Sequence, residues 1–342
     1  MKSRRQQGVV LALVLVLALL LSAAVITFTR NSVVDALIAR NRDNAAQAET
    51  LARGGVAIAT ALALEEVLAR LSQNSSPTSQ QPMLSTQVRS RQGHRLEVEI
   101  QDTGARLNLN SLVDFAQESD ELDQSEAEEF LVEFFKTIIE EVPLPPGEKF
   151  YDPRTLAENM IDYIDPNEMR TGGRGGEDDY YQRQDPPYRA ANRPLLSVEE
   201  LAMIEGFDKP LVDALTPYVT VYPLVGAQGI NVNTAPPHVL KAVYHGTSGD
   251  RRLASTDTIQ RILKERQEDR ILCDRTEVDP DRCIPLGDVL DGSLYPKVKL
   301  PSTETVFRVR STATAGEIER SLETVLDVTT PSQPRLLFWR FR

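Results

Sequence analysis

Histidine and cysteine are scarce in this chain, which has three histidines and two cysteines in 342 residues. The histidines, His94, His238 and His245, have no obvious serine or cysteine partner, and no HExxH motif or phosphate-binding loop occurs. The cysteines, Cys273 and Cys283, are too few and wrongly spaced for a CxxC redox pair or a zinc site. These absences argue against an enzyme, although a lone pair of catalytic carboxylates stays open as an alternative.

Proline is absent before Pro77, and this part of the chain has the features of a membrane helix. Residues 9–28 are almost entirely apolar, and a helix of about twenty residues spans the roughly 30 Å hydrocarbon core of a bilayer. Lys2, Arg4 and Arg5 precede the run, so the positive-inside rule places them in the cytoplasm and the rest of the chain outside. A plain signal anchor holding an external domain is the alternative explanation.

The only obvious processing point lies before this apolar run. A secretory signal is cut after its apolar region, at a small-residue motif, whereas here Gly8 directly precedes Val9. Cleavage between these two residues would remove the basic leader and leave the membrane segment at the start of the mature protein.

Helical periodicity continues beyond the apolar run to about Leu71. Apolar and small residues recur at three- and four-residue steps, and polar residues fill the other face. Gly54 and Gly55 are expected to weaken the helix where they stand together. We predict one helix of about sixty residues whose outer half packs on a globular domain. A coiled-coil stalk is the alternative, but the irregular, alanine-rich stripe fits it less well.

The chain is acidic, with a formal charge of -12, and beyond its anchor it is long enough for two or three domains. An acidic surface repels the phosphates of nucleic acid and is compatible with cation binding. Outside the cytoplasm Cys273 and Cys283 are expected to form a disulfide, which would stabilise so short a loop by about 2–3 kcal/mol.

The remaining sequence combines a little β structure with many helices. Residues 72–90 are rich in Ser, Gln and Pro and are predicted to be a linker, followed by a hairpin of strands at 94–100 and 105–110. Helices are expected at 125–142, 155–164, 197–206, 209–216, 236–244 and 257–267, and strands at 306–312, 318–328 and 336–341. This order indicates an α+β fold with helices inserted into a sheet domain.

Several motifs connect the chain to a known family. The leader KSRRQQG followed by VVLALVLVLALLL resembles the class III signal of type IV pilins and type II secretion pseudopilins. The ordered set LNLNSLV, DYIDPNEMRTGGRGGEDDYYQ, NRPLLSVEELAMIEGF, PYVTVYP, GINVNTAPPHVLKAV and RLLFWR resembles the type II secretion system protein K family, the large minor pseudopilins. The resemblance covers nearly the whole chain. It implies a pseudopilin fold, a long N-terminal membrane helix packed on a small antiparallel sheet, with a large inserted all-α domain that is similar to SAM and helix-hairpin-helix domains.

The resemblance also implies a domain organisation. Residues 1–8 would be the leader that is removed, and 9–72 the long helix, transmembrane over 9–28. The remaining parts would be the linker and first strands of the pseudopilin domain at 73–112, the inserted α-domain at 113–225, a second helical SAM-like region at 226–300, and C-terminal strands completing the sheet at 301–342.

For processing and assembly, the resemblance implies that a prepilin peptidase cuts after Gly8 and methylates Val9. Major pseudopilins carry a glutamate at the fifth mature position, which is Leu13 here, and protein K resembles this chain in lacking it. A carboxylate in lipid is costly without a nearby cation, such as the N-terminal amine of a neighbouring subunit. A subunit that has no such neighbour is more stable in the membrane with leucine at this position. Family members sit at the tip of the pseudopilus over the I- and J-type minor pseudopilins. They are single-pass proteins of the bacterial inner membrane, with a cytoplasmic N-terminus and a periplasmic C-terminal domain.

An acidic, glycine-broken segment at 162–179 is the best candidate for site chemistry. So many carboxylates repel one another unless a cation intervenes, and calcium takes six to eight oxygen ligands from irregular loops. The spacing is not that of an EF-hand. Because family members bind calcium in their periplasmic domain, the resemblance assigns metal binding first to Asp165, Glu168, Glu177 and Asp179, and next to Asp162. A solvated acidic loop is the alternative.

Two rival functions stay open. A minor pilin would share these physical features but would belong to a type IV pilus rather than to a secretion system. A membrane-tethered DNA-uptake protein would use helix-hairpin-helix elements, which residues 197–219 and 230–243 resemble. The second glycine of such a hairpin is missing after Gly206, and acidic neighbours such as Glu205 and Asp208 oppose DNA, so a packing module without nucleic acid is favoured.

Overall fold

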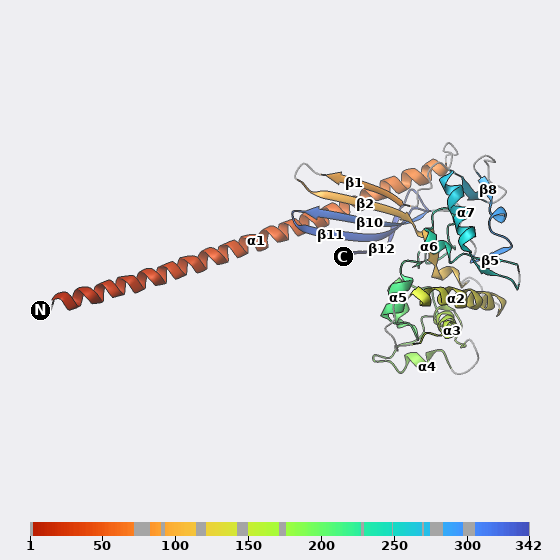
Figure 1. Cartoon of the computed structure of the whole chain (residues 1–342), viewed down its shortest axis with the longest axis horizontal. Helices are drawn as coiled ribbons and strands as arrows, with labels where there is room; N and C mark the ends of the chain where they lie inside the picture. The colour runs from red at the N-terminus through yellow and green to blue at the C-terminus, as the bar shows by residue number, and fades with distance from the viewer. Residues whose placement is uncertain are drawn as a thin grey trace.

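The computed structural model describes residues 3–71, 83–89, 93–113, 121–141, 150–170, 176–226, 229–247, 249–268, 270–273, 283–296 and 305–341. Figure 1 shows a long helix, α1, that projects from a head made of a sheet and a larger insert. The insert combines helices with short strands, so the all-α insert that the resemblance implied is not observed. The insert comprises residues 103–305 and lies at the end of the molecule farthest from the N-terminus.

Helix α1 runs without a break over Ser3–Leu71, which confirms the predicted long helix. Within Leu11–Glu65 it has a stretch that is long and apolar enough to cross a membrane, and the side chains of that stretch are exposed. The hydroxyls of Ser22 and Thr27 donate to the carbonyls four residues earlier, at 2.8 and 2.9 Å. These polar groups are therefore satisfied within the helix, as lipid requires.

The outer half of α1 packs on one face of a five-stranded sheet. The strands are ordered β1-β2-β10-β11-β12, and every pairing is antiparallel. The core between helix and sheet is made of small α1 side chains, such as Ala52 and Ala59, against branched strand residues, such as Val98 and Val309. The strands are β1 (Met83–Arg89), β2 (Arg95–Asp102), β10 (Val306–Ala315), β11 (Ile318–Asp327) and β12 (Arg335–Phe341). The three predicted C-terminal strands are therefore confirmed.

Gly55 marks the closest approach of α1 to the sheet. A Cβ at this position would collide with Ser311 Oγ and would lie 3.0 Å from side-chain carbons of both Leu96 and Val98. At the neighbouring Gly54 a Cβ would meet nothing within 4 Å. Only the second glycine is therefore required for packing, and the pair does not interrupt the helix.

The predicted hairpin between 94–100 and 105–110 is wrong. Strand β2 pairs instead with β10 and with β1, which lies inside the predicted linker. Leu107–Asn108 forms β3 instead, which pairs in parallel with β4 (Val219–Thr220) in the insert. The alternation at 105–110 misled the prediction because Leu107 and Leu109 are both buried in the insert, while the intervening asparagine makes hydrogen bonds there rather than facing water.

The insert contains most of the predicted helices. The predictions at 125–142, 155–164, 209–216 and 257–267 are confirmed by α2 (Glu121–Glu141), α3 (Pro153–Ile164), α5 (Lys209–Leu215) and α7 (Thr256–Gln267). The other elements are η1 (Thr103–Ala105), η2 (Leu109–Ser111), α4 (Asp178–Tyr181), η3 (Val198–Met203), α6 (Pro237–Leu240), β5 (Tyr244–Gly246), β6 (Arg252–Leu253), β7 (Ile271–Cys273), β8 (Cys283–Pro285), η4 (Leu286–Asp288) and β9 (Ser293–Tyr295).

Two helix predictions are wrong in type or length. Residues 198–203 form the 3-10 helix η3, and Ser197 makes no capping hydrogen bond there, because Glu200 instead pairs with Arg193 and the Leu196 N–H. The helix predicted at 236–244 is only one turn long in α6. Tyr244 at its expected end belongs to β5 and pairs with Tyr295 of β9, so tertiary strand pairing overrides the local helical pattern.

Buried apolar side chains from Leu107 to Leu290 form one continuous cluster in the insert. It includes the stacked rings of Phe130 and Phe134 on α2. A separate cluster lies between α1 and the sheet. The head therefore has two cores, and one of them serves the whole insert.

Two Asn-x-Asn pairs, which we name the Asn clamps, fix loops of the insert. In the first clamp Asn108 Oδ1 accepts from the Asn110 N–H at 2.9 Å. The Asn110 side chain then donates to the Leu195 carbonyl at 3.0 Å and accepts from the Leu195 N–H at 2.8 Å. One side chain thus satisfies both backbone groups of a buried residue distant in sequence.

The second clamp repeats this pattern. Asn231 Oδ1 accepts from the Asn233 N–H at 2.9 Å, and the Asn233 side chain bonds both the N–H and the carbonyl of Leu272 at 2.8 Å. Asn231 also donates to the buried carboxylate of Asp102, at the end of β2, at 3.0 Å. The second clamp therefore attaches the insert to the sheet.

Candidate metal centre

Two carboxylates come together at the C-terminal end of α3. The helix begins at Asp152, whose side chain accepts from the Thr155 N–H. Asp162 and Asp165 are three residues apart at its other end, a spacing that puts both on one face. Both are buried, with 4% and 0% of their surface exposed.

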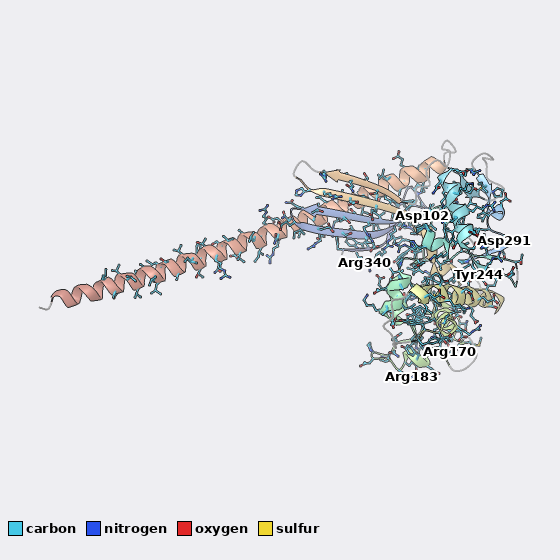
Figure 2. All side chains as sticks on the ribbon, viewed as in Figure 1. Asp102, Arg170, Arg183, Tyr244, Asp291 and Arg340 are labelled. Carbon is cyan, nitrogen blue, oxygen red and sulfur yellow. A yellow bond between two sulfur atoms is a disulfide. The ribbon has the colours of Figure 1, made fainter. Side chains whose placement is uncertain are left out.

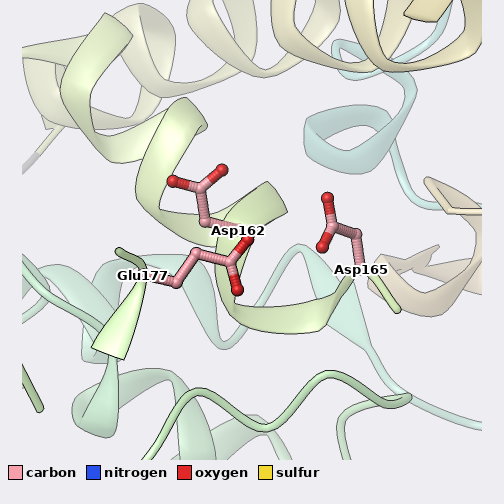
Figure 3. Close-up of side chains that lie close together, drawn as sticks. All are labelled: Asp162, Asp165 and Glu177. Atoms are coloured by element: carbon pink, nitrogen blue, oxygen red, sulfur yellow. The ribbon is translucent and has the colours of Figure 1, made fainter. Parts of the chain in front are cut away.

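A loop closure brings a third carboxylate to the same place. Met169 and Gly176 form an antiparallel bridge, so the chain returns to α3 and places Glu177 beside it. Glu177 is 6% exposed. Asp162, Asp165 and Glu177, here named the carboxylate trio, each offer an oxygen within 4.8 Å of the others (Figure 3).

One described arginine, Arg170, lies beside the trio. Arg170 Nε lies 4.0 Å from Asp162 Oδ2, but the same guanidinium also pairs with Glu205 at 3.2 Å. Burial first and the charge of Asp162 second raise the pKa of Asp165 to about 7. Burial, followed by Asp165 and Asp162, raises the pKa of Glu177 to about 8. The trio is thus a buried cluster in which burial and mutual repulsion favour the protonated forms of Asp165 and Glu177.

Asn192, which sequence reasoning missed, places its side-chain amide beside Glu177. Its Nδ2 donates to the Asn167 carbonyl at 2.7 Å and lies 3.5 Å from Glu177 Oε2. Its Oδ1 is buried and accepts no hydrogen bond from any described residue. The backbone of Asn192 has a φ of 43°, in the left-handed region. Nothing in the local sequence pattern distinguishes this asparagine from an ordinary loop residue.

The other two predicted ligands lie apart from the trio. Glu168 and Asp179 are both exposed, and neither joins the trio in the described part of the chain. Asp179 Oδ2 instead accepts from the Gly176 N–H at 3.3 Å. The structure therefore gathers three of the five nominated carboxylates.

The remaining site predictions fall at opposite ends of the molecule. Gly8 and Val9 lie in the helical backbone of α1. Cys273 and Cys283 are joined by a disulfide with a Cα–Cα distance of 5.8 Å. This bond connects β7 to β8, directly after the residue that the second Asn clamp holds.

Chemically, the trio provides oxygen acceptors alone. Ionised carboxylates and an amide oxygen are ligands for hard divalent cations, and calcium tolerates the irregular geometry of a loop better than magnesium does. Three buried carboxylates that each offer an oxygen within 4.8 Å of the others fit such an ion. Asp162, Asp165, Glu177 and Asn192 would hold it, and its charge would draw the end of α3 and the returning loop together.

Comparisons with known proteins agree on one family. The family model of type II secretion system (T2SS) protein K matches residues 105–224. Type II secretion system protein K of Klebsiella pneumoniae is 30% identical over 243 residues, covering 69% of this chain and 68% of that protein. The same protein of Aeromonas hydrophila is 26% identical over 239 residues, covering 68% and 66%. The chain thus spans about two thirds of the length of these relatives.

A solved structure, the GspK-GspI-GspJ complex from the enterotoxigenic Escherichia coli Type 2 Secretion System, contains a chain with a similar fold. The TM-score is 0.57 at 22% identity, and the match covers 88% of this chain and 99% of that one. The mixed helix and sheet architecture is therefore shared. The chain belongs to the type II secretion system protein K family, a family of structural minor pseudopilins rather than enzymes.

Proposed function

We propose that this minor pseudopilin occupies the tip of the type II secretion pseudopilus, where it helps to initiate and cap the filament during protein export across the outer membrane. The position of the insert carries this proposal. It lies beyond the sheet, at the end of the head opposite the membrane helix (Figure 1), where its bulk would prevent another subunit from stacking above.

An exposed apolar stripe on α1 supports contact with I- and J-type minor pseudopilins. Val33, Val34, Leu37 and Ile38 follow the membrane segment and are 53%, 46%, 54% and 45% exposed. Large apolar side chains that recur at helical spacing suit packing against sister helices. A solved relative is in complex with GspI and GspJ, which fits partners of this kind.

Co-purification tests the partnership. The full chain is co-expressed with I- and J-type pseudopilins and extracted in mild detergent. We expect Leu37→Glu to abolish recovery of the complex, while the matched charge change Arg42→Glu, also on α1, leaves it intact. Equal recovery with both variants would contradict packing through the stripe.

Processing and orientation are part of the same proposal. A prepilin peptidase cuts after Gly8 and the new N-terminus at Val9 is methylated, so that the membrane helix is retained. The basic leader is cytoplasmic and the head is periplasmic. A disulfide between Cys273 and Cys283 suits that oxidising compartment.

We further propose that the carboxylate trio and Asn192 bind calcium, which would stabilise the part of the insert around α3 and α4. The observation behind this is the burial of three mutually close carboxylates, with the side-chain amide of Asn192 beside Glu177. Glu168 and Asp179 are secondary candidates because both are exposed and distant from the trio.

Terbium luminescence and thermal unfolding test the calcium site. Tyr180 and Tyr181 follow Glu177 closely and can sensitise a bound lanthanide. We expect calcium to displace terbium and to raise the melting temperature, and Glu177→Gln to lose both effects. Glu168→Gln is the matched control and should keep them. Equal behaviour of the two variants would argue for a solvated acidic loop instead.

The finer description of the insert as a pair of SAM-like, helix-hairpin-helix-like regions is also a proposal. The repeated Asn clamps support two related halves. DNA binding by these elements is disfavoured because Asp208 Oδ1 already accepts from the Leu211 N–H at the start of α5, at 3.2 Å, where a hairpin would hold a phosphate. Absence of salt-dependent duplex DNA binding by the full chain would support this view.

A further inference from the structure

A polar pocket of about 80 Å³ lies where the sheet meets the insert. We name it the junction pocket. Arg308, Glu323 and Arg340 line it from the sheet, and Glu199, Thr216 and Tyr222 line it from the insert. Figure 2 labels Arg340 and Asp102, which lie at this boundary.

Arg106 lines the junction pocket and forms no ion pair at contact distance with any described carboxylate. Its single hydrogen bond to a described residue runs from Nη1 to the Thr216 carbonyl at 3.0 Å. Burial first and the nearby guanidinium of Arg308 second lower the pKa of Arg106 to about 10, against the opposing charge of Glu323. A partly buried cation next to another cation is unfavourable unless an anion compensates it.

The carboxylates around the junction pocket are engaged by other groups. The buried Glu323 is shared by Arg308 and Arg340, and Arg340 also pairs with Glu199. Asp102 accepts hydrogen bonds from Gly104, Asn231 and Thr234. Arg106, Arg308 and Arg340 therefore all line the junction pocket. Among the described residues, the hydrogen bond of Arg106 goes to a neutral carbonyl rather than to a carboxylate.

We propose that the junction pocket binds a small oxyanion, of the size of acetate or phosphate, on the guanidinium of Arg106. A planar guanidinium presents paired N–H donors that match the oxygens of a carboxylate or phosphate. An anion in this position touches groups of both the sheet and the insert. It thus fixes the orientation of the insert on the sheet, independently of the carboxylate trio.

Thermal unfolding of the full chain in mild detergent tests this site. Acetate or inorganic phosphate is added against chloride at equal ionic strength and pH. We expect a saturable rise in melting temperature of about 2 °C or more, which Arg106→Gln abolishes. Arg95→Gln, which removes an exposed arginine of β2 paired with Glu97, is the matched control and should keep the rise. An equal rise in Arg106→Gln, or none in the unaltered chain, would overturn the proposal.

Ligand-observed NMR keeps the test independent of how the variant folds. With the unaltered chain, the acetate methyl signal should show saturation transfer, and the phosphate ³¹P line should broaden until excess of the other anion competes. If acetate and phosphate displace each other, both bind at one oxyanion site. Response to phosphate alone or acetate alone identifies which class the pocket prefers, and absence of any response contradicts the site.

Discussion

The contact between α1 and the sheet differs in kind from the contacts that hold the insert. The first is made by alanines, valines and one glycine of α1 against apolar strand residues. The insert also has an apolar core, but its long loops are fixed by asparagine side chains that bond distant backbone groups. A helix against a sheet needs only complementary shape, because both satisfy their own backbone. Irregular loops need side chains to supply the missing hydrogen bonds.

Removing a clamp should give the largest loss of stability. In Asn233→Ala the buried N–H and carbonyl of Leu272 lose their partners, and we expect a destabilisation of about 2–5 kcal/mol, since each orphaned group costs roughly 1–3 kcal/mol. Urea denaturation measures this loss. Gln87→Ala, an exposed amide on the edge strand β1, is the control and should change stability by under about 0.5 kcal/mol. A small effect of Asn233→Ala would show that water replaces the clamp.

Adding a methyl group between α1 and the sheet should have the next largest effect. Gly55→Ala should destabilise the protein by about 1–3 kcal/mol, as overpacking does, whereas Gly54→Ala should stabilise it by up to about 1 kcal/mol through helix propensity. Removing the colliding hydroxyl with Ser311→Ala should recover part of the loss in the double variant. Equal effects at the two glycines, measured by urea denaturation, would contradict the close approach.

The effect of pH on the stability of the ion-free protein should be smaller than the effects of these substitutions. It should arise from the insert. The pKa values of Asp165 and Glu177 are raised to about 7 and 8, so folding favours their protonated forms. Their stabilising contribution is present at low pH and is lost as pH rises through these values. In chelator, the urea midpoint should therefore be lower at pH 8.5 than at pH 6, by on the order of 1 kcal/mol of stability.

Calcium should reverse that trend, because it binds the ionised carboxylates that predominate at high pH. The Asp165→Asn, Glu177→Gln double variant is the control, and its stability in chelator should change less over the same pH range. An unchanged pH dependence in the double variant would place the titrating groups elsewhere.

The sequence predicts best those parts whose pattern reflects local structure. The length of α1, four helices of the insert and the three C-terminal strands follow from periodicity and turn residues. The pairing of β2 with β1 does not follow from these patterns. The residues of β1 resemble a polar linker, and only tertiary pairing sets which strands lie next to β2. Asn110 ends the predicted strand at 105–110, where alternation would place it facing water, yet it is buried. Alternation alone does not distinguish an exposed from a buried asparagine.

The candidate site is predicted in part for the same reason. Asp162 and Asp165 share a helix face by spacing, so their proximity follows from sequence. The bridge between Met169 and Gly176 brings Glu177 to them. Asn192 lies in a loop, and its own backbone is in the left-handed region. Both depend on loop closure, which composition does not specify. Glu168 and Asp179 were assigned as ligands through the family resemblance, but both are exposed in the structure.

Mass spectrometry of the N-terminus of the native protein tests the central claim most directly. A subunit that is trimmed before its membrane helix and assembles by that helix should begin at Val9 and carry one methyl group on its amine. A native protein that begins beyond residue 28 would contradict the account, because its head would have no membrane helix with which to join the pseudopilus.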